Sequence, residues 1–231
     1  MSGSYDTIGR MDVRFSDGPT DLVTWIAADP GVMQRASHAV VVDGGTWLVD
    51  PVDAPAVRDH LAAMPPIAGV IQLLDRHNRD CALLADHFGA PLHRLPTDAI
   101  PDTPFQVISV RSSRRWTERA LWWPDRRCLI VAEMLGTASY FRVPGKRVGV
   151  HPFARLSPPN VLSGFAAEHL LMGHGDSVHD SDAGALADAA IAHALAGHTE
   201  VRRRAEHLGN DQTPAIGPPQ CALGPPAARP H

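Results

Sequence analysis

The segment at residues 67–74 constrains the fold of this chain more than any other feature. It reads Ile-Ala-Gly-Val-Ile-Gln-Leu-Leu, a mostly apolar run that is bounded by prolines before it and charged residues after it. It is short and β-branched, and it lacks the alternation of a half-exposed strand. Such a run is typical of a strand that is buried on both faces, which favours a layered α/β architecture.

Polar side chains of the types that bind metals follow this strand directly. They form the sequence Asp75-Arg76-His77-Asn78-Arg79-Asp80-Cys81. A second short strand, predicted at residues 168–172, leads into Gly173-His174-Gly175, where the two glycines let the backbone turn sharply around the histidine. The sequence therefore places two polar segments where strands end and loops begin.

The elements around these segments alternate between strands and helices. The pair Asp43-Gly44 predicts a tight hairpin between strands at residues 38–42 and 46–49. Further strands are predicted at residues 22–27, 105–110, 119–123 and 128–131. Helices are predicted from an N-cap at Asp53 to the prolines at 65–66, at residues 81–88, and at residues 182–196 with Gly197 as the end.

The length of 231 residues fits one domain with a substantial core. We expect an N-terminal extension at residues 1–20, one folded domain at residues 21–208, and a disordered tail rich in proline and alanine at residues 209–231.

Composition excludes several classes of partner. Lys and Arg number 21 against 25 for Asp and Glu, so we expect neither nucleic acid nor an anionic membrane as a partner. No window reaches the roughly 18 apolar residues of a membrane span. The three cysteines are too few for a disulfide framework, which agrees with a cytoplasmic location. The sequence leaves the oligomeric state open.

The residues alone leave the chemistry open. His77, Asp80, Cys81 and His174 are metal-ligand types, but Asp80 is equally suited to cap the helix that follows it. Cys81 at a helix start could be a thiolate nucleophile, although the neighbouring carboxylate of Asp80 opposes ionisation of its thiol. Phosphate-loop, dinucleotide-binding and serine-elbow motifs are absent from the sequence.

The order of elements from residue 22 to residue 195 resembles the metallo-β-lactamase superfamily. The run Trp47-Leu48-Val49-Asp50 is similar to the early strand of that family, which ends in aspartate, and the Gly-His-Gly around His174 is similar to its last histidine motif. The resemblance implies an α/β fold, a four-layer αββα sandwich of two similar halves.

The resemblance also implies a degraded two-metal centre. Active members carry His-x-His-x-Asp-His where this chain has Arg76-His77-Asn78-Arg79-Asp80-Cys81. The position of the third histidine holds Leu95, with His93 two residues earlier and about 6 to 7 Å away along the strand. The first metal site would then consist of Arg76, Asn78 and Leu95, which cannot hold an ion.

The second site implied by the resemblance retains residues that can bind metal. Its positions hold Asp80, Cys81, Glu133 and His174, which could bind one zinc ion and among which Asp80 and His174 are the candidate catalytic groups. In one interpretation the protein is a metallo-hydrolase-like protein with at most one metal and an unknown small-molecule substrate. In the other it is a metal-free, non-catalytic binding protein, in which Arg76 replaces the ion beside Asp80 and Glu133, and His77 and Asn78 line the ligand site.

Overall fold

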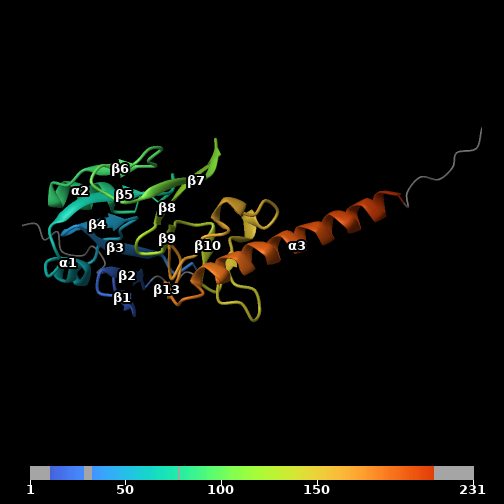
Figure 1. Ribbon diagram of the computed structural model, residues 1–231, viewed down its shortest axis with the longest axis horizontal. Helices are drawn as coiled ribbons and strands as arrows, with labels where there is room; N and C mark the ends of the chain where they lie inside the picture. Colours follow the sequence, from blue (N-terminus) through green and yellow to red (C-terminus); the bar gives the residue numbers. More distant parts are fainter. Residues whose placement is uncertain (1–10, 29–32, 78, 211–231) are drawn as a thin grey trace, which may run out of the picture. The chain divides into compact units, whose positions relative to one another are not determined.

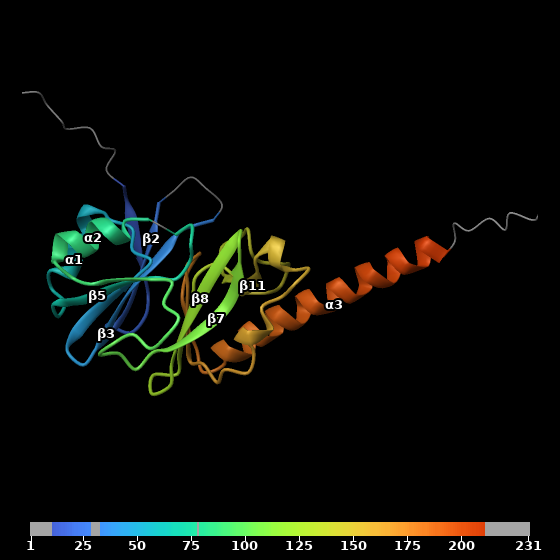
Figure 2. The same cartoon turned by 90° about the horizontal axis from the view of Figure 1, so that it is seen from above.

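The computed structural model describes residues 11–28, 33–77 and 79–210. Two sheets lie face to face, with two short helices outside the first sheet and the start of a long helix against the second (Figures 1 and 2). The contacts divide the chain into a unit at residues 1–198 and a unit at residues 199–231, of which the structure describes only the helical residues 199–210.

The first sheet has the strand order β1-β2-β3-β4-β5-β6. Its strands are β1 (Val13–Ser16), β2 (Leu22–Ala27), β3 (Ala36–Val42), β4 (Gly45–Val49), β5 (Ile67–Gln72) and β6 (Leu92–Arg94). Neighbouring strands are antiparallel from β1 to β4 and parallel from β4 to β6. The two parallel connections contain α1 (Pro55–Leu61) and α2 (Cys81–Phe88).

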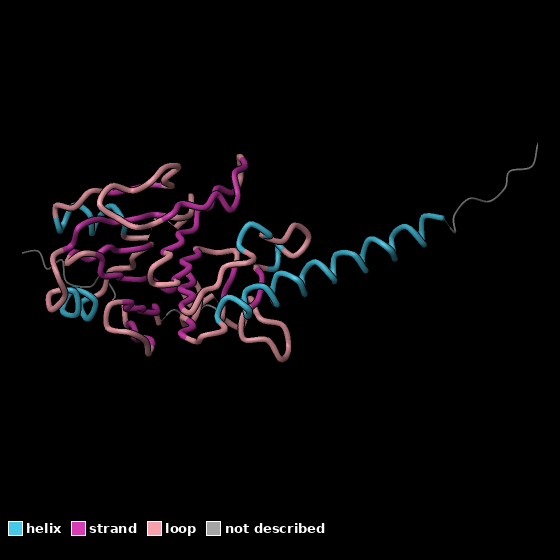
Figure 3. Tube along the Cα trace, in the orientation of Figure 1, coloured by secondary structure: helices cyan, strands magenta, loops and turns pink. Residues whose placement is uncertain are grey.

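The second sheet has the strand order β13-β12-β9-β8-β7. Its strands are β7 (Gln106–Ser113), β8 (Trp116–Trp123), β9 (Cys128–Val131), β12 (His169–Met172) and β13 (Val178–His179). A separate antiparallel pair joins β10 (Leu135–Gly136) to β11 (Gly149–Val150). Irregular chain with the 3-10 helices η1 (Pro152–Ala154) and η2 (Asn160–Leu162) precedes β12, as the trace in Figure 3 shows.

Side-chain alternation builds a separate core on each face of the first sheet. On β4 and β5, Leu48 and Val70 pack with α1 and α2, whereas Val49 and Ile71 face the second sheet. The larger core cluster covers both faces of the second sheet and includes Leu121, Leu129, Ile130, Leu170 and Leu171, and the first turns of α3 (Ala183–Asn210) add alanines and Ile191 to it. The buried strand predicted at residues 67–74 is confirmed as β5, with Leu73 and Leu74 still buried beyond its end.

Several local predictions are confirmed and others are wrong. The hairpin between β3 and β4 turns through Asp43 and Gly44, which have φ values of 46° and 81°. Asp53 is not the N-cap of α1: Ala54 holds that position without a side-chain hydrogen bond, and the Asp53 carboxylate pairs with Arg58 instead. Gly197 does not end the last helix, which continues to Asn210, since a single glycine weakens a helix without breaking it.

The predicted N-terminal extension and C-terminal tail each contain residues of a described strand or helix. Strand β1 lies within the segment interpreted as an N-terminal extension, and it pairs with β2. Residues 209 and 210 belong to α3, and the rest of the predicted disordered tail lies outside the described residues. No helix in the described part of the chain is long and apolar enough to cross a membrane.

Candidate functional site

Polar residues from both sheets meet at the carboxyl ends of four strands. Asp50 follows β4, and the polar loop that contains His77 follows β5, its parallel neighbour. Glu133 follows β9 and His174 follows β12, and these strands are also parallel neighbours, with Val131 opposite Met172. Parallel strands end at the same edge of a sheet, so each half of the sandwich delivers two polar groups to one place.

His77, Glu133 and His174 form the one group in the described residues that could hold a metal ion. One ligand atom from each lies within 4.8 Å of the others, and all three side chains are buried. The Nε2 atoms of the two histidines are 3.3 Å apart. This arrangement offers two imidazole nitrogens and one carboxylate to a single point.

Hydrogen bonds at the other ring nitrogen set the tautomer of each histidine. His77 Nδ1 lies 3.1 Å from the Asp50 carboxylate, and His174 Nδ1 lies 3.0 Å from the carbonyl oxygen of Met33. Because these oxygens can only accept, both Nδ1 atoms carry a proton. Burial lowers the pKa of His77 and lowers that of His174 well below its ordinary value, and the nearby Arg79 adds to both shifts. Both rings are therefore neutral near pH 7, and their Nε2 lone pairs face each other.

The Glu133 carboxylate has a cationic neighbour on one side and a histidine on the other. Arg76 donates to Glu133 Oε2 from Nε at 3.2 Å and from Nη2 at 3.1 Å. His151 Nδ1 accepts the backbone N–H of Phe153, which leaves a proton on Nε2, 3.6 Å from Glu133 Oε1. The Arg76 guanidinium also lies 4.2 Å from the centre of the Trp116 ring, a cation–π arrangement that holds it at the mouth of the site.

Glu118 fixes the backbone that presents Glu133. Its Oε1 accepts the N–H groups of Glu133 and Met134, and its Oε2 accepts Nε1–H of Trp116. The side chain is fully buried on β8, and burial raises its pKa to about 7 against the opposing effect of these donors. A glutamate inside the core thus determines the direction in which Glu133 leaves β9.

Arg79 ties three chain segments together behind the histidines. Its guanidinium donates to the backbone carbonyls of Ala36, Asp50 and Gly173, which belong to β3, the end of β4 and the end of β12. Its Nη2 also lies 3.4 Å from His77 Nε2. Burial lowers the pKa of Arg79 from its ordinary value, but the side chain remains a cation beside the two histidines.

The two glycines around His174 are required by close packing. A Cβ on Gly173 would lie 2.2 Å from the carbonyl oxygen of Ala132, and a Cβ on Gly175 would lie 2.4 Å from Thr137 Oγ1. Gly175 also has a φ of 87°, in the left-handed region that favours glycine. The Gly-His-Gly sequence thus allows His174 to sit close to β9 while its ring turns toward His77.

The structure brings together only part of the predicted metal set. Glu133 and His174 lie in the group, but the Asp80 carboxylate accepts the backbone N–H of Asp53 at 2.8 Å. The Cys81 thiol is directed to the carbonyl oxygen of His77 and is buried in the core beneath the helices, where burial raises its pKa to about 12. Such a thiol is protonated near pH 7, which disfavours a nucleophile.

The remaining residues of the predicted site have the following positions. Arg76 pairs with Glu133 as expected, and its described contacts do not include Asp80. His77, predicted to line a ligand site, belongs to the group that could hold a metal ion. Asn78 lies outside the described residues. His93 is on β6 and contacts Trp47, away from this site, and Leu95 follows it with a φ of 47°.

Three residues of the site were not recognised in the sequence. Glu118 lies on β8, where it is followed by Arg119 and then by the apolar residues 120–123, and a carboxylate so close to an apolar run is a signal that could have identified it. His151 and Arg79 carry no such signal, because both belong to irregular chain whose path depends on tertiary contacts.

Comparison with known proteins identifies the fold. The sequence matches no protein-family model and no curated protein. Among solved structures, the DIM-1 metallo-beta-lactamase has a TM-score of 0.54 at 13% identity, covering 80% of this chain and 100% of that chain. A metallo-beta-lactamase from Pontibacter korlensis has a TM-score of 0.57 at 9% identity, covering 78% of this chain and 99% of that one.

A third similar structure has a different name. It is a fragment of a putative diflavin flavoprotein A 5 from Nostoc sp. PCC 7120, with a TM-score of 0.56 at 15% identity and coverage of 80% of this chain and 98% of that chain. The chain has the metallo-β-lactamase fold, and the predicted αββα sandwich is confirmed. At these identities the likeness concerns the fold alone.

Proposed function

We propose that this protein is a metallo-hydrolase-like member of its fold class that binds one divalent transition-metal ion through His77, Glu133 and His174. One observation carries the proposal: the Nε2 atoms of two buried imidazoles lie 3.3 Å apart, while the Nδ1 atom of each ring is hydrogen bonded to an oxygen acceptor, so the two Nε2 lone pairs are directed at one point. Lone pairs in that arrangement repel each other unless a cation lies between them. Arg79 Nη2 lies 3.4 Å from His77 Nε2, whereas among the described residues His174 Nε2 is within hydrogen-bond distance of His77 Nε2 alone.

The donor set and its surroundings fit a transition metal. Two histidines and one carboxylate suit zinc or iron(II). Ligating histidines usually donate their second N–H to a carboxylate or carbonyl, as His77 does to Asp50 and His174 to Met33. When bound, such an ion would supply Lewis-acid polarisation of a substrate oxygen.

The residues of the chain have definable roles in this proposal. The Asp50 carboxylate accepts hydrogen bonds from the backbone N–H of Leu73 and from Nδ1–H of His77, so it fixes the ring of His77 relative to β5. Arg76 and His151 position the Glu133 carboxylate from either side. Relative to the set predicted from sequence, His77 takes the place of Asp80 and Cys81, and the expectation of at most one metal is retained as part of the proposal.

A metal-free binding protein is the second candidate, and the arginines favour it. Arg76 neutralises Glu133, and the cation of Arg79 lies beside the histidines, where it opposes the approach of a metal ion. In this candidate the paired carboxylate and neutral histidines bind a ligand without an ion.

Metal analysis separates the two candidates. Protein purified without chelators should contain about one zinc or iron ion per chain, and added zinc should raise the melting temperature of chelator-treated protein. His77→Ala and His174→Ala should each abolish both effects, while His169→Ala, which alters a histidine on β12 that pairs with His179, should leave them unchanged. The metal proposal would be refuted if the purified protein contained no metal and its melting temperature did not change on addition of zinc or iron(II).

Two further variants test the roles of the neighbouring residues. Asp50→Asn should weaken metal affinity about 10- to 100-fold, because it removes the charged acceptor of His77. Arg76→Ala should strengthen metal affinity, since it frees Glu133 from a competing cation. Unchanged metal affinity in both variants would show that Asp50 and Arg76 do not influence the metal site.

A further inference from the structure

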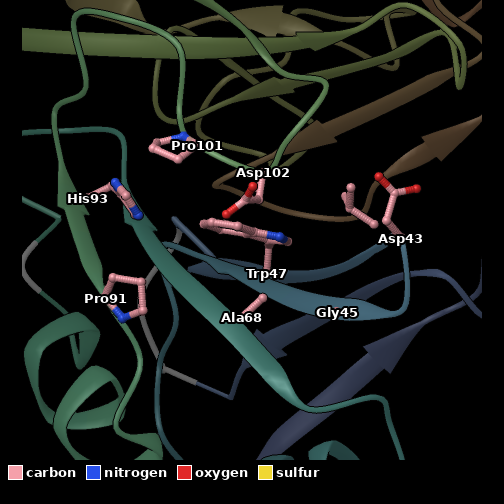
Figure 4. A pocket seen from close by; sticks show the side chains of 9 residues that line it. Asp43, Gly45, Trp47, Ala68, Pro91, His93, Pro101 and Asp102 are labelled. Carbon is pink, nitrogen blue, oxygen red and sulfur yellow. The ribbon is translucent and has the colours of Figure 1, made fainter.

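A separate cavity of about 540 Å³ lies at the other end of strands β4 and β5, beside the β3–β4 hairpin (Figure 4). Its walls come from the hairpin, from β5 and β6, and from the loop that precedes β7. The lining residues are Val42, Asp43, Gly45, Trp47, Ala68, Pro91, His93, Pro101 and Asp102. None of them belongs to the candidate metal site, and the volume is in the range of pockets for small molecules.

Trp47 provides a hydrogen-bond donor that is open to this cavity. Its side chain is only 4% exposed, yet no hydrogen bond from its indole Nε1–H to another described residue is present. In Figure 4 the nitrogen lies at the end of the ring nearer Asp43. The indole N–H is therefore available to a hydrogen-bond acceptor on a ligand in the cavity.

Two carboxylates give the cavity a negative potential. Asp43 and Asp102 come from different loops, and in Figure 4 Asp102 lies above the Trp47 ring. Neither makes an ion pair or a side-chain hydrogen bond with another described residue, and no Lys or Arg lines the cavity. Burial lowers the pKa of His93, which leaves its ring neutral near pH 7, so it does not offset the two negative charges.

The remaining lining is apolar or aromatic. Val42, Ala68, Pro91 and Pro101 line the cavity, and the rings of Trp47 and His93 lie 5.7 Å apart at 45°. Gly69 lets the Trp47 ring lie flat on β5, because a Cβ there would be 2.3 Å from the ring. The cavity therefore combines an apolar floor, one free N–H donor and two free carboxylates.

We propose that this cavity binds a small organic ammonium compound that also carries a hydroxyl or carbonyl oxygen. The ammonium group pairs with Asp43 and Asp102, the oxygen accepts the N–H of Trp47, and the apolar part of the ligand packs on the prolines and the indole. The site is independent of metal binding by His77, Glu133 and His174.

Calorimetric titration with 2-amino-1-phenylethanol tests the proposal. The matched neutral probe is 1-phenyl-1,2-ethanediol, which replaces the amine with a hydroxyl. We expect saturable binding of the amine, binding of the diol that is at least about tenfold weaker, and an affinity for the amine that falls with rising salt. Equal binding of the two probes, or no saturable binding of the amine, would overturn the proposal.

Variants locate the binding to this cavity. The double variant Asp43→Asn with Asp102→Asn should weaken the amine about tenfold or more, while Asp98→Asn, on the same loop as Asp102 but outside the lining, should not. Trp47→Phe removes the N–H and keeps an aromatic ring, and it should lower affinity in protein whose circular dichroism is unchanged. If the wild-type affinity persists in the double variant, the amine does not bind here.

Discussion

The carboxylates at the two ends of the parallel strands β4 and β5 differ in whether they have a cationic partner. At the carboxyl ends of β4 and β5, Glu133 pairs with Arg76, and the ring of Trp116 lies under the same arginine. At the other end, Asp43 and Asp102 have no cationic partner in the described structure, and no arginine lies over Trp47. Polar groups that the chain itself pairs contribute to stability, whereas polar groups left open to a cavity are available to a ligand.

The largest effect should come from Arg79, the cation that joins three segments at the paired end. Arg79→Met should lower the free energy of unfolding by about 3 kcal/mol, because it leaves the carbonyls of Ala36, Asp50 and Gly173 without their donor. Denaturant unfolding measures this, with Arg94→Met on the exposed side of β6 as the control. Equal loss in both variants would show that the carbonyls find other donors.

The second prediction concerns the loss of folding stability at low pH. Burial lowers the pKa of His38 to about 3 from its ordinary value of 6.5, so the folded protein keeps this ring neutral where the unfolded chain takes up a proton. Stability is then lost as the pH falls below 6.5. Between about pH 7 and pH 5 the loss is about 2 kcal/mol for such a histidine.

Unfolding at several pH values checks this for His38→Gln, which should flatten the pH dependence. His93→Gln in the cavity should change it less, because that ring is only partly buried. If the two variants have the same pH profile, the paired end of the strands is not the more acid-sensitive region.

A smaller effect is expected at the mouth of the candidate metal site. Arg76→Ala should destabilise chelator-treated protein by about 1 kcal/mol, since the Glu133 side chain is 9% exposed but that of Arg76 is 44% exposed and screened by water. Thermal unfolding of the metal-free variant is the measurement. A loss as large as that of Arg79→Met would mean that Arg76 acts as a buried ion replacement.

The smallest effect should appear at the open end of the strands. Asp43→Asn and Asp102→Asn should each change stability by no more than about 0.5 kcal/mol in the absence of ligand, because neither carboxylate has a partner to lose. Denaturant unfolding of both single variants checks this. Clear destabilisation by either would indicate an internal role for that carboxylate and would weaken the contrast between the two ends.

Local patterns predicted much of the fold but only part of the site. The Asp43-Gly44 hairpin, the buried strand β5 and the helix at Cys81–Phe88 were all readable, because turn chemistry and apolar periodicity are local. Asp80 and Cys81 belong to the same polar segment as His77, yet their side chains point to α1 and the outer core. Arg79 has a φ of 37°, a backbone conformation that cannot be predicted from the sequence of the loop.

The sequence by itself indicated that polar side chains follow buried strands and that His174 lies in a tight turn between two glycines, because strand ends and tight turns depend on neighbouring residues. Only the tertiary structure decided which of these side chains meet. The register of β9 against β12 sets Glu133 beside His174, and the hydrogen bond that His77 donates to Asp50 turns its ring toward them. Those contacts join residues far apart along the chain, so no local pattern could specify them.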